Sequence, residues 1–213
     1  SANGIYLTNS SYLTLTNNTI SLGGEYGIHS YDSDNSVVNN NTITGQYNTT
    51  IRMRDCDNCD FEGNTLSGDM ILKIDSSVNL DIHNNHILDH RYGFDLNYCD
   101  SAQITSNEMI SPSSSMFGDI IRLIRNPNSI STVFEENVFS IETHIESWVY
   151  GLLEFNQSEF RNNIINASSP SNSGNSAYGL IDADESVISG NTIQINHYRG
   201  AYTRLIKISG SEN

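Results

Sequence analysis

A short pattern of one polar and one large apolar position recurs along the whole chain. Each copy consists of Asn, any residue and then a large apolar residue. The eight copies begin at Asn18, Asn41, Asn64, Asn85, Asn107, Asn137, Asn163 and Asn191. Subtracting successive numbers gives spacings of 23, 23, 21, 22, 30, 26 and 28 residues. A repeat of this length is typical of a solenoid, in which each repeat forms one coil.

Two columns of apolar residues accompany the repeat. The first column, three residues before each Asn, comprises Leu15, Val38, Phe61, Ile82, Ile104, Phe134, Phe160 and Ile188. The second column, two residues after each Asn, comprises Ile20, Ile43, Leu66, Ile87, Met109, Phe139, Ile165 and Ile193. Around both columns apolar and polar residues alternate with period two, which is typical of strands. We therefore predict an all-β chain that forms a single-stranded right-handed parallel β-helix of about eight to nine coils.

The residues of the Asn motif are expected to be structural. The position before each repeat Asn is mostly Asn or Gly, which indicates a left-handed backbone at a tight turn. The repeat Asn side chains are expected to form a ladder of amide hydrogen bonds from coil to coil. Catalytic or binding residues therefore have to be sought outside the motif.

Several segments resemble a known superfamily. Residues 4–7 (GIYL), 17–20 (NNTI) and 39–43 (NNNTI) are similar to the parallel β-helix repeats of pectin-lyase-like proteins, in particular the NosD-type and carbohydrate-binding and sugar-hydrolase repeats. The resemblance covers nearly the whole chain, so we expect one β-helix domain over residues 1–213, as a fragment of a longer protein. It implies the fold more than the activity, because the superfamily includes polysaccharide lyases, glycoside hydrolases, uronate epimerases, phage tailspikes and non-catalytic modules. A methanogen disaggregatase is similar in kind.

Composition narrows the partners. The net charge of −15 argues against nucleic acid or an anionic membrane as the main partner. No apolar run is long enough for a transmembrane helix. Cys56 and Cys99 lie two coils apart, roughly 9–10 Å, which is too far for a disulfide bond. Cys56, Cys59 and Cys99 are therefore expected to be buried or semi-buried free thiols. We expect an extracellular or cell-surface protein.

One strand face is expected to gather the basic residues. Counting from the core columns gives an outward row of Tyr6, His29, Arg52, Lys73 and Asp95, and a second row of Thr8, Tyr31, Arg54, Asp75 and Asn97. The register is expected to slip by one residue in the sixth coil, where Arg122 and Arg125 continue the face. Five of the ten Lys and Arg residues lie on this face. Two interpretations stay open: a charge ladder that pairs Lys73 with Asp95 and limits aggregation, or a cleft for an anionic saccharide.

The spacing of the repeats supports the cleft. The longer repeats of the second half place extra residues at 110–118, 140–149, 166–177 and 194–204. These loops are expected to leave the helix on one side and to wall one flank of the basic face. They carry Trp148 and Tyr198, whose aromatic rings suit the apolar faces of sugars.

Two reactions on an acidic polysaccharide fit these residues. For β-elimination, Arg52 or Ca²⁺ would neutralise the uronate carboxylate, Lys73 would remove the proton, and Tyr31 or His29 would serve as the acid. For hydrolysis, Asp75 and Asp95 would be diagonal neighbours roughly 7–8 Å apart, which suits an inverting mechanism. The predicted catalytic residues are Lys73, Asp95, Asp75, Arg52 and His29. The predicted substrate-binding residues are Arg54, Tyr31, Asn97, Arg122, Arg125, Trp148 and Tyr198. No metal site and no cofactor are assigned, with Ca²⁺ kept as an option.

These inferences predict a carbohydrate-active β-helix enzyme that cleaves an anionic extracellular polysaccharide, either as a glycoside hydrolase or as a polysaccharide lyase. One alternative is a non-catalytic surface, adhesin or sugar-binding module. Another is a phage tailspike fragment, which would assemble as a trimer.

Overall fold

The described part of the chain consists of strands and turns. The computed structural model describes residues 3–21, 24–88, 92–111, 121–125, 128–142, 149–153, 155–169, 177–181, 183–197 and 203–207. All the regular secondary structure in these residues consists of β-strands. None of them belongs to a helix long and apolar enough to cross a membrane. The prediction of an all-β chain is therefore confirmed.

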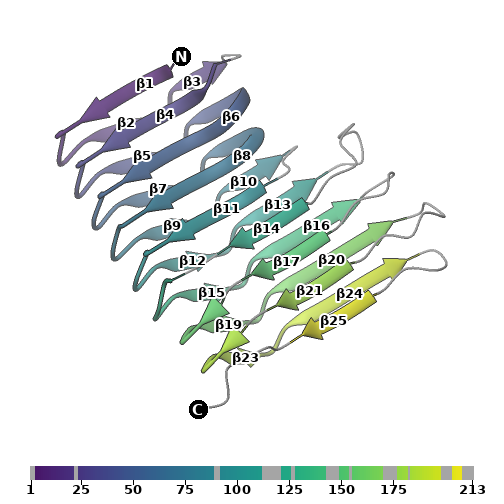
Figure 1. Ribbon diagram of the computed structural model, residues 1–213. Coiled ribbons are helices and arrows are strands. Elements are labelled where there is room, and N and C mark those ends of the chain that lie inside the picture. Colours follow the sequence, from purple (N-terminus) through teal and green to yellow (C-terminus); the bar gives the residue numbers. More distant parts are fainter. Residues whose placement is uncertain are drawn as a thin grey trace.

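Parallel strands stack along the molecule in two main sheets, from β1 at one end of the stack to β25 at the other (Figure 1). We call the eight-stranded one the narrow sheet. Its strands are β2 (Thr14–Thr16), β5 (Val37–Asn39), β7 (Asp60–Glu62), β9 (Asp81–His83), β12 (Gln103–Thr105), β15 (Val133–Glu135), β19 (Glu159–Arg161) and β23 (Val187–Ser189). Each pairs in parallel with the strand one coil away, which is the arrangement of a parallel β-helix.

We call the fifteen-stranded sheet the wide sheet, because most coils contribute two strands to it. Its strands are β1 (Asn3–Thr8), β3 (Thr19–Ser21), β4 (Tyr26–Tyr31), β6 (Thr42–Arg54), β8 (Thr65–Asp75), β10 (His86–Leu88), β11 (Tyr92–Asn97), β13 (Glu108–Ser111), β14 (Ile121–Arg125), β16 (Val138–Glu142), β17 (Val149–Leu153), β20 (Ile164–Ser169), β21 (Ala177–Ile181), β24 (Thr192–His197) and β25 (Thr203–Lys207). A two-stranded sheet joins β18 (Phe155–Asn156) and β22 (Ala183–Asp184).

The apolar columns form the core between the sheets. Register pairs place Val38 against Phe61 and Ile43 against Leu66, so each column residue lies over its counterpart one coil away. Both columns are buried except at their ends, where Leu15, Ile188 and Ile193 are partly buried. A single coil cannot bury its apolar residues alone, so the end coils keep a partly exposed surface.

The turn before each repeat Asn has the predicted left-handed backbone. The φ angle is positive at all eight positions of this column, namely Asn17, Asn40, Gly63, Asn84, Ser106, Glu136, Asn162 and Gly190. The repeat asparagines then form the predicted ladder. In its middle, the Asn85 side chain donates to Asn107 Oδ1 at 2.9 Å, and Asn85 Oδ1 accepts from Asn64 Nδ2 at 2.9 Å and from the Asn64 backbone N–H at 3.0 Å.

Gly63 gives a direct test of this turn. Its φ is +62°, and an added Cβ would lie 2.6 Å from Oδ1 of Asn40. We expect Gly63→Ala to lower the free energy of unfolding by about 1–2 kcal/mol, because alanine is disfavoured in a left-handed backbone. Gly63→Asn should lower the free energy of unfolding by a smaller amount, as measured by urea titration. Both variants add the same Cβ, and asparagine tolerates this conformation, as it does at Asn84. Equal losses would contradict the backbone explanation.

Candidate functional site

The outward residues of the wide sheet stand in the two predicted rows. Parallel register places Tyr6, His29, Arg52, Lys73 and Asp95 in one row, and Arg125 continues it. The neighbouring row contains Thr8, Tyr31, Arg54, Asp75 and Asn97. We call this surface, over β1, β4, β6, β8 and β11, the polar face.

The polar face points outward because the residues between its members are buried. Ile28 and Ser30 in β4 are each 1% exposed, and Leu72 and Ile74 in β8 are equally covered. Alternation of side chains along each strand then turns His29 and Lys73 away from the core. Ser30 stands out as a polar residue at an inward position, where its hydroxyl lies 4.0 Å from the Cys56 thiol.

A third row of residues paired along the wide sheet was not predicted. Tyr26, Thr49, Met70, Tyr92 and Arg122 pair in sequence along the sheet, and each lies three residues before a member of the first row. The pairing skips one residue in each strand, such as Gly27 and Gly93, so strict alternation is interrupted there. A recurring Tyr-Gly pair, at residues 26, 92, 150 and 178, is the sequence signal that could have indicated this row.

This row also corrects the expected register slip in the sixth coil. Arg122 pairs with Tyr92 and Arg125 pairs with Asp95, with the same three-residue spacing as Tyr92 and Asp95 themselves. The sixth coil therefore stays in register. The apparent slip came from counting by twos across the skipped residue.

Three tyrosines surround His29. The ring centroid of His29 lies 4.4 Å from that of Tyr26, 4.7 Å from Tyr31 and 5.3 Å from Tyr6. Its Nε2 is covered and has no hydrogen-bond partner among the described residues. Burial lowers the pKa of His29 below its ordinary value, and the nearby charge of Arg52 lowers it further. His29 is therefore a mainly neutral imidazole at pH 7, and it stands among aromatic rings.

Tyr26 is held in its protonated form. Burial raises the pKa of its hydroxyl, and a hydrogen bond with Glu25 raises it further. The neutral imidazole of His29 thus stands next to the protonated phenol of Tyr26, which is a suitable set for proton transfer and for contact with sugar rings.

The charged residues of the polar face are paired with one another. Arg52 binds Asp75 at 2.9 Å, and Asn97 donates to the other oxygen of Asp75 at 3.4 Å. The Lys73 ammonium lies 3.8 Å from Asp95, which is the pair that the sequence predicts across one rung. Arg54 forms an ion pair with the adjacent residue Asp55, with 3.1 Å between Nε and Oδ2. Asp75 and Asp95 are diagonal neighbours as expected, and each faces a cation.

Eight of the twelve predicted site residues thus come together on the polar face. These are His29, Tyr31, Arg52, Arg54, Lys73, Asp75, Asp95 and Asn97. Arg122 and Arg125 occupy matching backbone positions in β14. Trp148 and Tyr198 lie outside the described residues, as does most of the predicted loop wall, so the cleft stays a prediction.

The three cysteines belong to the interior. Cys56, Cys59 and Cys99 are free thiols and at most 1% exposed. A hydrogen bond between the thiols of Cys56 and Cys59 lowers the pKa of Cys56 and raises that of Cys59. Burial raises the pKa of Cys99 to about 12. The C-x-x-C pair is part of the core, as predicted, and is not part of the polar face.

Comparison with protein families gives one match. The family described as "Right handed beta helix region" matches residues 1–109 of the 213-residue chain. The matched segment holds five repeat asparagines, from Asn18 to Asn107, so it accounts for about five turns and not for the eight to nine predicted. A comparison with curated proteins finds no match.

Two solved structures of one enzyme share the fold over most of the chain. One variant of a periplasmic alginate epimerase is 15% identical with a TM-score of 0.56, and the match covers 92% of this chain and 47% of that one. A double mutant of the same enzyme is 16% identical with a TM-score of 0.56, covering 95% and 48%. An alginate lyase from Paenibacillus is 14% identical with a TM-score of 0.49, covering 86% and 79%. The chain thus spans about half the length of the epimerase.

Proposed function

Because this chain belongs to the family of right-handed β-helix regions, we propose that it is a carbohydrate-active β-helix that binds an anionic polysaccharide on its polar face and cleaves it by β-elimination. The low identity to the alginate epimerase supports a shared fold only. The proposal rests on one observation, the neutral imidazole of His29 among three tyrosines and beside Arg52.

The polar face offers suitable contacts for a chain of acidic sugars. Tyrosine rings pack against the apolar faces of sugars, and arginine binds carboxylates through paired hydrogen bonds. Successive rungs repeat these groups every ~4.8 Å. A polymer lying across the rungs would therefore meet His29, Arg52 and Lys73 in order.

The proposed elimination assigns one role to each group. Arg52 balances the uronate carboxylate, and His29 accepts the proton from C5. The electron pair left at C5 forms the double bond to C4, the bond from C4 to the glycosidic oxygen breaks, and Tyr31 donates a proton to that oxygen. Nε2 of His29 is covered in the free protein, so a neighbouring ring has to turn aside. Tyr6, whose residue surface is 56% exposed, is free to do so.

Elimination is favoured over hydrolysis because of the ion pairs. An inverting hydrolase needs one protonated carboxyl group and one carboxylate free to activate water. Asp75 is engaged through both oxygens, and Asp95 faces Lys73. Nε2 of His29 has no such partner in the part of the chain that the structure describes.

A screen on uronate-containing polymers tests the proposal. The purified chain is incubated with alginate, pectate and glycosaminoglycans, and both the ultraviolet absorbance of unsaturated uronate and new reducing ends are measured. We expect both signals to rise together. Reducing ends without unsaturation would indicate hydrolysis, and would move the chemistry to Asp75 and Asp95. The double variant Lys73→Ala/Asp95→Ala should lose activity and keep its fold, whereas full activity would exclude this part of the face.

A non-catalytic sugar-binding module is the second candidate. The observation that favours it is the pairing of Arg52, Arg54 and Lys73 with neighbouring carboxylates, which is also how a purely structural charge ladder would look. It predicts saturable binding of an acidic polymer without product. Either function places the protein where such polymers occur, in the periplasm, outside the cell or on its surface. A trimer, as in a tailspike, would be recognised from the mass in light scattering.

A further inference from the structure

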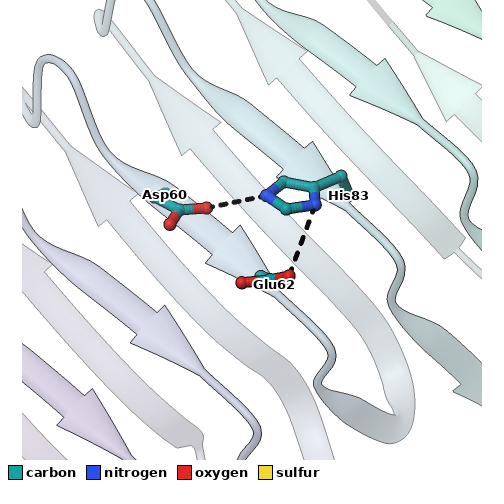
Figure 2. Close-up of side chains that lie close together, drawn as sticks. All are labelled: Asp60, Glu62 and His83. Carbon is teal, nitrogen blue, oxygen red and sulfur yellow. Dashed lines mark ion pairs between the residues drawn. The ribbon is translucent and has the colours of Figure 1, made fainter.

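The outer face of the narrow sheet carries a group of three metal-ligand side chains. Asp60 and Glu62 lie on β7 and His83 lies on β9, with Glu62 and His83 directly opposite each other across one rung. One ligand atom from each residue lies within 4.8 Å of the others. Figure 2 shows the imidazole of His83 with one ring nitrogen paired to Asp60 and the other to Glu62. This group is on a different sheet from the polar face.

We propose that Asp60, Glu62 and His83 form a binding site for a divalent transition-metal ion of the Zn²⁺ type. Imidazole with carboxylates suits Zn²⁺ and its first-row neighbours, whereas Ca²⁺ and Mg²⁺ prefer oxygen ligands alone. Three protein ligands leave a coordination position open for water or a further ligand. The net charge of −15 also attracts cations.

The spacing of the donor atoms fits a shared ion. Nε2 of His83 lies 3.2 Å from Oδ1 of Asp60. Two ligand atoms at 2.0–2.1 Å from one tetrahedral metal stand about 3.3 Å apart. Oδ1 of Asp60 is covered and accepts no hydrogen bond from the described residues, even though the imidazole is close. Apart from this close approach of the imidazole, Oδ1 has no polar partner among the described residues, so it is available to a cation.

A neighbouring amide orients the two carboxylates toward this point. Asn39, one rung away on β5, donates from Nδ2 to Oδ2 of Asp60 at 3.3 Å and to Oε2 of Glu62 at 3.4 Å. Its own oxygen accepts from the Glu62 backbone N–H at 3.0 Å, which fixes which way the amide faces. The remaining oxygens, Oδ1 and Oε1, are those that face His83. Support of this kind by second-layer hydrogen bonds is usual at metal sites.

The other nitrogen of His83 also has a partner. The amide nitrogen of Asn84 lies 3.1 Å from Nδ1. With the amide turned over, its oxygen would accept the Nδ1–H of a metal-bound imidazole. Glu62 Oε1, now 4.0 Å from Nδ1, needs a side-chain rotation to complete the set.

The test is a calorimetric titration of the chelator-treated, dialysed protein with Zn²⁺. We expect one saturable site per chain in the wild type and no saturable binding in His83→Gln. The control is His86→Gln, which removes a histidine from an exposed pair with Glu108 at 2.8 Å and should bind as the wild type does. Asn39→Ala should bind about 10–100-fold more weakly, because it leaves the ligands in place and removes their support.

A second measurement distinguishes metal binding at this site from metal binding by the cysteine thiols. Co²⁺ bound at this site should give visible d–d bands without a thiolate charge-transfer band. Circular dichroism should be unchanged in every variant, because the three side chains are partly exposed. The proposal fails if Zn²⁺ shows no saturable binding, if His83→Gln binds as tightly as the wild type, or if the Co²⁺ spectrum indicates sulfur ligands.

Discussion

Replacing Asn85 with alanine should lower the free energy of unfolding by about 3 kcal/mol or more, because a buried hydrogen-bonding hub is removed. Asn85 is 2% exposed. Its side chain donates hydrogen bonds to the carbonyl of Phe61 at 2.8 Å and to Asn107. Its oxygen is the acceptor for the backbone N–H of Asn64. Alanine leaves that N–H buried and unpaired, with a polar cavity beside it.

The matched control for this prediction is Asn18→Ala, at the first rung of the ladder. Asn18 is only partly buried, and its side chain donates to Thr16 O at 3.2 Å and to Asn41 Oδ1 at 3.0 Å. Water can replace these bonds at the end of the stack, so we expect a loss of about 1 kcal/mol. Urea unfolding followed by circular dichroism measures both. Similar losses for the two variants would show that position in the ladder does not matter.

Replacing His29 with glutamine should reduce the rate of polysaccharide cleavage by at least ~100-fold, the usual range for removing a general base. Glutamine keeps the polarity and approximate size of the side chain, so the fold and the affinity for the polymer should change little. A loss in kcat with a nearly constant KM is expected, measured from the absorbance of unsaturated uronate. His86→Gln, a histidine outside the polar face, should retain full activity. Equal activity in His29→Gln would remove His29 from the mechanism.

The pH profile gives a second test of His29. Burial and Arg52 lower its pKa from the ordinary value of 6.5, so the imidazole stays able to accept a proton at pH values below 6.5. The acid limb of kcat/KM should therefore lie below pH 6.5. Because the unfolded chain takes up this proton at a higher pH than the folded one, His29 should also make the protein less stable as the pH falls below 6.5. His29→Gln should be less sensitive to acid in the same range. A limb at or above pH 6.5 would contradict the assignment.

The repeat asparagines, the apolar columns and the first two outward rows were predictable from the sequence. Each coil must bury the same positions against its neighbours, so the pattern persists from Leu15 to Ile193 and carries its own register. Period-two alternation then placed His29, Arg52, Lys73 and Asp95 in one row without any coordinates. Arg125 follows this row in the structure, where the sequence suggested a slip.

Only the tertiary structure decided how the outward side chains meet. The pairing skips Gly27 and Gly93, which breaks the alternation. The sequence pattern therefore did not predict that Tyr26 and Tyr92 lie beside the polar face. Arg52 reaches diagonally to Asp75, a choice set by side-chain length and packing that no spacing encodes. Asp60 and His83 are 23 residues apart in the sequence and lie on the outer face of the narrow sheet. That face has no repeating apolar pattern from which their contact could be predicted. The sequence by itself determined the β-helix and its phase, because burial repeats in every coil. Contacts between exposed side chains depend on the local bulges, lengths and rotamers of single residues, and these do not repeat.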